Sequence, residues 1–206
     1  MNYEQEITVE VNTSYEDLHK ILEKNNFKIL EEYDLIDYYM IRKDYPLTQN
    51  HLETLKHCVL IRQIIEENKN TSMLTYKYKE YNSLGEITKQ GKVNCDVEST
   101  EKAKKLFEML GYYQLIGIKD HIIVYANEST EMCVQLVNNK HIYIEIEEKF
   151  NHINKQYNNI EEMKEVINEY KIPIKNNDYF VKKAEIELKE CLINTNYLDQ
   201  ILEIDR

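Results

Sequence analysis

The chain has 206 residues, with 37 Asp or Glu against 26 Lys or Arg, so its formal net charge is −11 at pH 7. Such an acidic balance argues against binding to a nucleic-acid backbone, but it leaves room for a local basic pocket that holds a small anion. No stretch reaches the about 18–20 apolar residues of a membrane span, and the N-terminus lacks the regions of a signal peptide. We therefore expect a cytoplasmic protein with no membrane contact and enough length for one substantial core.

Glycine and cysteine usage narrows the chemistry further. The four glycines form neither GxGxxG nor GxxxxGK[ST], so a phosphate-binding glycine loop is excluded and side chains would have to hold any phosphate. No GxSxG or HExxH motif occurs either. The four cysteines are scattered without CxxC spacing, which favours free thiols in a reducing compartment over disulfides or zinc ligands.

Alternation of apolar and polar residues predicts eight mostly antiparallel strands. The dipeptide Asn138-Asn139 is expected to form the tight hairpin turn between the last two of them. The predicted strands span residues 3–11, 27–42, 55–65, 72–81, 86–95, 112–126, 131–137 and 140–149.

Helical periodicity is confined to four segments. A capping box over Thr13–Glu16 predicts a short helix after the first strand, and Ser99 or Thr100 begins another that Gly111 ends. Two further apolar stripes, over residues 160–170 and 181–191, predict helices after Phe150.

This pattern predicts an α+β fold. Eight strands suit a closed antiparallel barrel with a ligand-sized interior, a β tunnel, with helices inserted after the first and fifth strands. We expect residues 1–150 to form the tunnel core and residues 151–206 to form C-terminal helices packed on it, as a single domain overall.

Acidic residues repeat at period two in the first and last strands. Side chains two apart in a strand share a face, so the acids of each strand lie side by side. Such a surface repels itself unless cations sit between the carboxylates, which are the ligands that Mg²⁺ and Mn²⁺ prefer. The residues concerned are Glu4, Glu6 and Glu10 in the first strand, with Thr8 between them, and Glu145 and Glu147 in the last.

The middle strands carry basic side chains. Arg62, Lys77, Lys119 and His121 would neutralise phosphate oxygens if they faced the same interior. The simpler interpretation of each motif alone is a solvated strand face, and His141 fits a surface or tunnel histidine better than a metal ligand. Together the acidic and basic strands favour a polar interior where divalent cations and a polyanion meet.

In order and spacing these motifs resemble the CYTH family, also called the triphosphate tunnel metalloenzymes, over residues 3–150. The family's eight-stranded β tunnel carries ExExK, L-R-x-R, T-x-K, K-x-R and E-x-E strands, in that order. In this chain Thr8, Leu60 and His121 stand where three basic residues of those motifs are expected. The matching segments are Glu4–Thr8, Val59–Arg62, Thr75–Lys77, Lys119–His121 and Glu145–Glu147.

The resemblance implies roles for these residues. It assigns Mg²⁺ or Mn²⁺ as cofactor and a small-molecule triphosphate as partner, with a monomer or homodimer as the assembly. Glu4 and Glu6 would also be the catalytic carboxylates, and Glu10 is a secondary candidate on the metal face. The implied metal ligands are Glu4, Glu6, Glu145 and Glu147, and the implied triphosphate ligands are Arg62, Lys77, Lys119 and His121.

Three functions stay open at this point. The leading one is metal-dependent hydrolysis of an inorganic or organic triphosphate, with cyclisation of ATP, as in class IV adenylate cyclases, as a variant. The second is a tunnel that binds a phosphorylated ligand without turning it over, and the third is a barrel that serves only as an interaction protein. The replaced basic residues leave open whether the chain is an enzyme.

Overall fold

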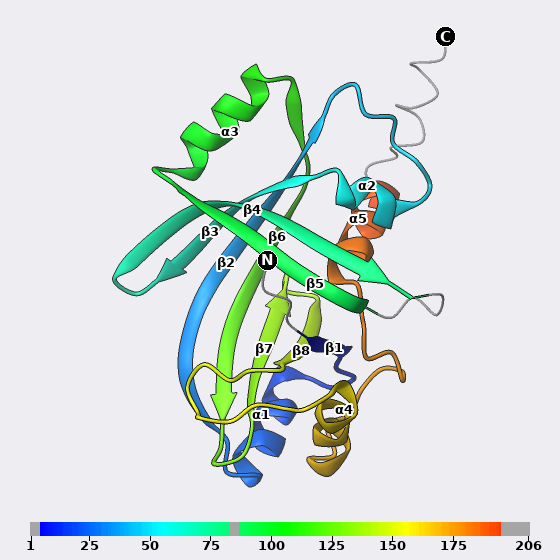
Figure 1. Cartoon of the computed structure of the whole chain (residues 1–206). Coiled ribbons are helices and arrows are strands. Elements are labelled where there is room, and N and C mark those ends of the chain that lie inside the picture. The colour runs from blue at the N-terminus through cyan, green and yellow to red at the C-terminus, as the bar shows by residue number, and fades with distance from the viewer. Residues whose placement is uncertain (1–4, 83–86, 195–206) are drawn as a thin grey trace.

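The computed structural model describes residues 5–82 and 87–194. Eight strands and five helices occur in this part of the chain (Figure 1), and none of these helices is long and apolar enough to cross a membrane. In chain order they are β1 (Glu6–Glu10), α1 (Tyr15–Lys24), β2 (Lys28–Arg42), α2 (His51–Lys56), β3 (Val59–Glu66), β4 (Lys69–Tyr81), β5 (Ile87–Val97), α3 (Thr100–Met109), β6 (Tyr112–Ala126), β7 (Glu131–Val137), β8 (His141–Glu147), α4 (Ile160–Glu169) and α5 (Lys183–Asn194).

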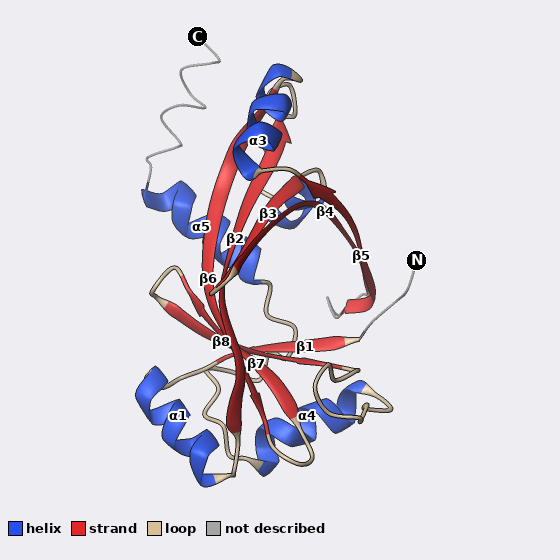
Figure 2. Cartoon of the chain, turned by 90° about the vertical axis from the view of Figure 1, so that its left-hand side faces the viewer, coloured by secondary structure: helices blue, strands red, loops and turns tan. Residues whose placement is uncertain are grey.

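All eight strands form one antiparallel sheet in the order β1-β8-β7-β6-β2-β3-β4-β5, which confirms the predicted α+β class and the strand number. Figure 2 shows the sheet bending so that β4 and β5 arch over the side on which β1 and β8 lie. Within the described residues no ladder joins β1 to β5, so the sheet is curled but open and the predicted closed barrel is not observed. Alternation fixes which residues share a face, whereas closure depends on tilt and register, which a pattern does not contain.

The outer face of the sheet is covered by three helices. Helices α1 and α4 bury Leu22 and Ile167 against the odd-numbered apolar residues of β1 and the even-numbered ones of β8, such as Val9 and Ile144. Helix α3 covers the other end, where Phe107 packs near Ile61. Complete burial of such side chains stabilises the fold by about 1.5–3 kcal/mol each.

The inner face is covered at one end only. Helices α2 and α5 contact each other and pack there, with Leu188 of α5 among Tyr39, Leu60 and Tyr143 from the sheet. The C-terminal helices therefore lie on both faces, α4 outside and α5 inside. The rest of the inner face carries polar side chains together with a small apolar cluster of Leu35, Ile122 and Val124.

Local backbone chemistry confirms several expected boundaries and corrects two. Asn138 and Asn139 form the β7–β8 turn with φ values of 48° and 58°, and Gly111 follows α3 with a φ of 85°. The first helix is capped by Ser14, whose hydroxyl accepts from the Asp17 amide, rather than by Thr13. The third strand begins at Val59 and not at Leu55 as expected, because residues 51–56 form α2, whose first turn the Asn50 side chain caps by accepting from the Glu53 amide.

Candidate functional site

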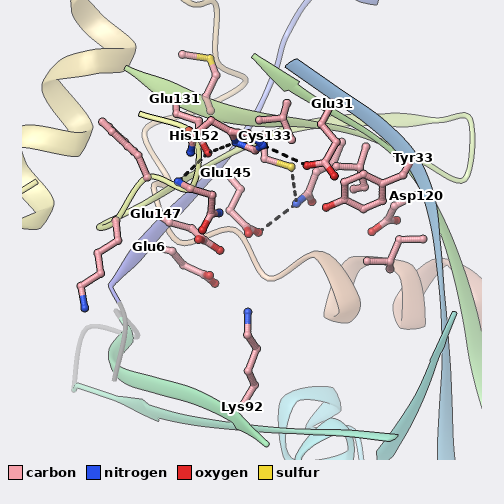
Figure 3. Close-up of a pocket in the computed structure, with 18 of the residues that line it drawn as sticks. Glu6, Glu31, Tyr33, Lys92, Asp120, Glu131, Cys133, Glu145, Glu147 and His152 are labelled. Atoms are coloured by element: carbon pink, nitrogen blue, oxygen red, sulfur yellow. Dashed lines mark hydrogen bonds and ion pairs between the residues drawn. The ribbon is translucent and has the colours of Figure 1, made fainter. Parts of the chain in front are cut away.

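A pocket of about 410 Å³ opens on the inner face and is called the main pocket below. Its walls have opposite charge. Glu6, Glu145 and Glu147 line it from β1 and β8, whereas Arg62 and Lys77 line it from β3 and β4. Lys92 extends from β5 toward the glutamates (Figure 3).

Glu6, Glu145 and Glu147 form one group, the acidic trio. Each offers a carboxylate oxygen, and these oxygens all lie within 4.8 Å of one another. The sheet brings them together because Glu6 stands opposite Glu147 in the β1–β8 ladder and Glu145 lies two residues away on the same face. Glu4, which the sequence adds to this set, lies outside the described residues.

The donor set of the acidic trio fits a hard divalent cation. Mg²⁺ and Mn²⁺ prefer carboxylate oxygens and keep several waters, so they need only a few protein ligands. Three carboxylates at this spacing repel one another, and a cation between them would remove the repulsion. The trio is half-buried, so water and salt screen this repulsion less than they would on a fully exposed surface.

Arg62 is fixed by a buried carboxylate. Its Nε and Nη2 groups donate to the two carboxylate oxygens of Asp37, each over 2.7 Å, and neither side chain is more than 15% exposed. Burial works to raise the pKa of Asp37, but the hydrogen bonds and charge of Arg62 outweigh it and lower that pKa. The guanidinium therefore stays charged and is held in one orientation at the pocket wall.

A second buried network joins α5 to the acidic trio. The Lys183 ammonium donates to Asp120, whose side chain is 1% exposed, and to Gln135 Oε1 over 3.0 Å. The Gln135 amide in turn donates to Glu145 Oε2 over 3.2 Å. Burial works to lower the pKa of Lys183, yet the charge and hydrogen bond of Asp120 raise it, so this lysine stays protonated.

Lys77 and Lys92 stand opposite each other in the β4–β5 ladder and both line the main pocket. Sequence reasoning found Lys77 but missed Lys92. The signal would have been the pairing of these two predicted strands, because residues that stand opposite each other in a ladder share a face.

Two of the expected basic residues do not reach this pocket. Asp120 and Ile122 of β6 line it, so Lys119 and His121 project from the opposite, outer face of that strand. There Lys119 pairs with Asp34 at 3.3 Å, and His121 lies between Asp34 and Glu32. The K-x-R interpretation of residues 119–121 selected the wrong face of β6.

Glu10 shares the inner face of β1 with Glu6 but lies in a different cluster. Its carboxylate pairs with His141 Nδ1 at 2.9 Å and with Lys175 Nζ at 3.0 Å. The other ring nitrogen of His141 pairs with Glu190 of α5 at 2.9 Å. The structure thus separates Glu10, the secondary metal candidate, from the acidic trio.

The segment after β8 closes one end of the main pocket. Glu131 accepts hydrogen bonds from the backbone amides of Asn151 and His152, over 3.2 and 2.8 Å. His152 Nδ1 also lies 3.2 Å from Glu131 and its Nε2 lies 3.6 Å from Glu31 (Figure 3). The sequence assigned no role to these residues because nothing in it indicated that this loop returns to β7.

No family model matches the chain. It is 23% identical over 188 residues, 89% of this chain and 98% of the relative, to a Methanocaldococcus jannaschii protein named "Putative adenylate cyclase MJ0240".

Solved structures share the fold. The PH1819 protein of Pyrococcus horikoshii matches with a TM-score of 0.67 and 15% identity, over 91% of this chain and 99% of that one. A Vibrio parahaemolyticus protein described as a "putative adenylate cyclase" matches with a TM-score of 0.53 and 9% identity, over 86% of this chain and 95% of that one. The structural likeness establishes the fold, and the named relative supports a family of the CYTH type.

Proposed function

We propose that the main pocket binds a triphosphate together with Mg²⁺ or Mn²⁺ and that the chain hydrolyses it. The observation that carries this proposal is the opposition of two charges across one pocket. The acidic trio offers oxygen ligands on one wall, and Arg62, Lys77 and Lys92 face it from the other strands. A polyanion with a bound cation complements both walls at once.

The side chains would divide the work by charge. The acidic trio would hold the cation, which supplies neutralisation of phosphate charge and a more acidic bound water. Arg62 carries five N–H groups and Asp37 takes two of them, so the remaining ones suit phosphate oxygens. Lys77 and Lys92 would add charge at the far end of the triphosphate, and Gln135 would orient Glu145.

Cyclisation of ATP is the second candidate. It is favoured by the name of the M. jannaschii relative, which is that of an adenylate cyclase. The same wall charges would serve it, because both reactions neutralise a polyphosphate and expel a phosphate leaving group. In hydrolysis water attacks the terminal phosphorus and phosphate is released, whereas in cyclisation the ribose 3′-hydroxyl attacks the α-phosphorus and pyrophosphate leaves.

An activity screen tests the proposal. The full chain is incubated with tripolyphosphate, ATP or thiamine triphosphate and either Mg²⁺ or Mn²⁺, and released phosphate, pyrophosphate and cyclic AMP are measured. We expect turnover of at least one compound that depends on the metal. Metal-dependent binding without turnover would mean that the protein binds a triphosphate but is not an enzyme. Absence of any metal-dependent triphosphate binding would refute the proposal.

The variant Glu145→Gln tests whether the acidic trio binds the metal ion. It keeps the size of the side chain and removes one negative ligand from the acidic trio, so Mn²⁺-dependent binding of tripolyphosphate should be lost in titration calorimetry. Glu32→Gln, on the outer face of β2, is the matched control and should bind as the wild type does. Equal behaviour of the two variants would remove the acidic trio from the metal site.

A further inference from the structure

Lys183, the first residue of α5, connects two buried groups of the sheet. Its ammonium donates to the carboxylate of Asp120 on β6 and, over 3.0 Å, to Oε1 of Gln135 on β7. Asp120 and Gln135 are 1% and 5% exposed, and Lys183 lines the main pocket beside them. Gln135 Nε2 then donates to Glu145 Oε2 over 3.2 Å. These four side chains, called the polar row below, link α5 to a member of the acidic trio.

The chemistry of its members fixes the direction of the polar row. An ammonium group can only donate hydrogen bonds, and an ionised carboxylate can only accept them. The Gln135 amide lies between Lys183 and Glu145, so it turns its oxygen to the lysine and its NH₂ group to the glutamate. Without the lysine the amide could also turn the other way, which would place its oxygen against the Glu145 carboxylate. Lys183 therefore selects the amide orientation that holds Glu145.

The charge of Lys183 and its hydrogen bonds have opposite consequences for a cation held by the acidic trio. A positive charge near a divalent cation repels it, so by charge alone Lys183 would weaken metal binding. The direct contact with Asp120 offsets much of that charge. The hydrogen bond through Gln135, in contrast, fixes the position of a carboxylate that the cation needs. The two effects can therefore be separated by experiment.

From this geometry we propose that Lys183 is a positioning residue of the metal site, which fixes the Gln135 amide and through it holds Glu145 in the orientation that binds a divalent cation. This inference rests on the proposed function, because it takes the acidic trio as the cation site. Groups that hydrogen-bond to metal ligands typically change metal affinity by about 10- to 100-fold. Helix α5 thus contributes to metal binding through a residue that is not itself a ligand.

Binding of Mn²⁺ alone to the full chain, measured by titration calorimetry, tests this role. Lys183→Met removes the ammonium and should weaken Mn²⁺ binding by roughly 10- to 100-fold. If Lys183 acted by charge alone, the same variant would bind Mn²⁺ more tightly than the wild type. Lys183→Arg, which can still donate to both Asp120 and Gln135, should restore most of the affinity. Lys189→Met, the same change at an exposed position of α5, should leave the affinity unchanged.

A double-mutant cycle shows whether the effect passes through Gln135. Gln135→Met removes both amide hydrogen bonds and leaves the Lys183–Asp120 pair intact, so it should lose about as much Mn²⁺ affinity as Lys183→Met. Adding Lys183→Met to Gln135→Met should cost nothing further, because both changes break the same polar row. Lys183→Met leaves Asp120 buried without its partner. If that variant does not fold, Lys183→Met combined with Asp120→Asn removes both charges and takes its place.

The outcomes separate this inference from the proposed function. If Lys183→Met binds Mn²⁺ as tightly as the wild type or more tightly, the positioning role is wrong and the metal site stands. Losses that add up in the double variant also overturn the role, because Lys183 would then act independently of Gln135. If the wild type binds no Mn²⁺ by itself, this inference fails, whereas the proposed function fails only if tripolyphosphate with Mn²⁺ is not bound either.

Discussion

Two aspartates three residues apart on β2 show how differently the two faces of one sheet treat charge. Asp37, on the inner face, has 5% of its side chain exposed and forms a bidentate pair with Arg62. Asp34, on the outer face, has 31% of its side chain exposed and pairs with both Lys119 and His121. The pKa of each is lowered, but for Asp34 the hydrogen bond from His121 is the largest cause, whereas for Asp37 two hydrogen bonds must first offset burial.

The difference teaches what the buried pair is for. Removing two charges from water costs several kcal/mol, which their attraction offsets only when geometry is good, so a buried pair adds little net stability over an apolar pair. It does fix the position of the guanidinium, whereas the exposed cluster around Asp34 can rearrange in solvent. Buried pairing on the inner face therefore favours a preorganised anion site, and the outer face carries ordinary surface charge.

The largest expected effect breaks the inner pair. Asp37→Ala leaves the Arg62 charge buried without its partner, and we expect the free energy of unfolding to fall by about 3–5 kcal/mol. Asp34→Ala, the matched change on the outer face, should cost about 1 kcal/mol or less, because solvent screens its partners. Urea denaturation at neutral pH measures both, and equal losses would mean that the two faces do not differ in this way.

The comparison also predicts where phosphate binds. Lys77→Met on the inner face should weaken Mn²⁺-dependent tripolyphosphate binding by roughly 10- to 100-fold, since hydrogen bonds to charged groups contribute about 1.5–3 kcal/mol. Lys119→Met, on the outer face of β6, should leave the affinity within twofold of wild type. Titration calorimetry of both variants measures these affinities. A loss of affinity in Lys119→Met would mean that Lys119 contacts the triphosphate, as the K-x-R motif implied.

Period-two patterns predicted much of the sheet and part of the site. All eight strands were expected, as was the Asn138-Asn139 turn, because alternation and turn chemistry are local properties. The same alternation placed Glu145 beside Glu147, and the structure brings both together with Glu6 in the pocket that Arg62 and Lys77 line.

The remaining site residues depend on contacts between distant segments. Lys183 reaches Asp120 because α5 packs on the inner face, a tertiary contact over 63 residues that no local pattern contains. Lys119 and His121 were assigned to the wrong side because alternation defines two faces but does not say which one is inside when both carry charge. Helix α2 was missed because it has only six residues, which is too short for a periodic apolar signal.

The smallest expected effect concerns His141 and its two glutamate partners, which are on average more exposed than the Asp37–Arg62 pair and less exposed than the cluster around Asp34. His141 has 14% of its side chain exposed and joins Glu10 of β1 to Glu190 of α5. Burial works to lower the pKa of His141, but the hydrogen bonds and charges of the two glutamates outweigh it and raise that pKa. The cluster thus links α5, which carries Lys183, to the edge strand β1.

The sign of the pH dependence follows from the raised pKa. Because the folded protein binds the proton of His141 more tightly than the unfolded chain does, this stabilisation is fully present below about pH 6.5, the ordinary value for histidine, and is lost as pH rises through the raised pKa. We expect a loss of roughly 1 kcal/mol or less, as for other partly exposed pairs. Urea denaturation across about pH 6–9 measures it. His141→Gln should flatten this dependence, whereas a wild-type slope retained in that variant would show that other groups cause it.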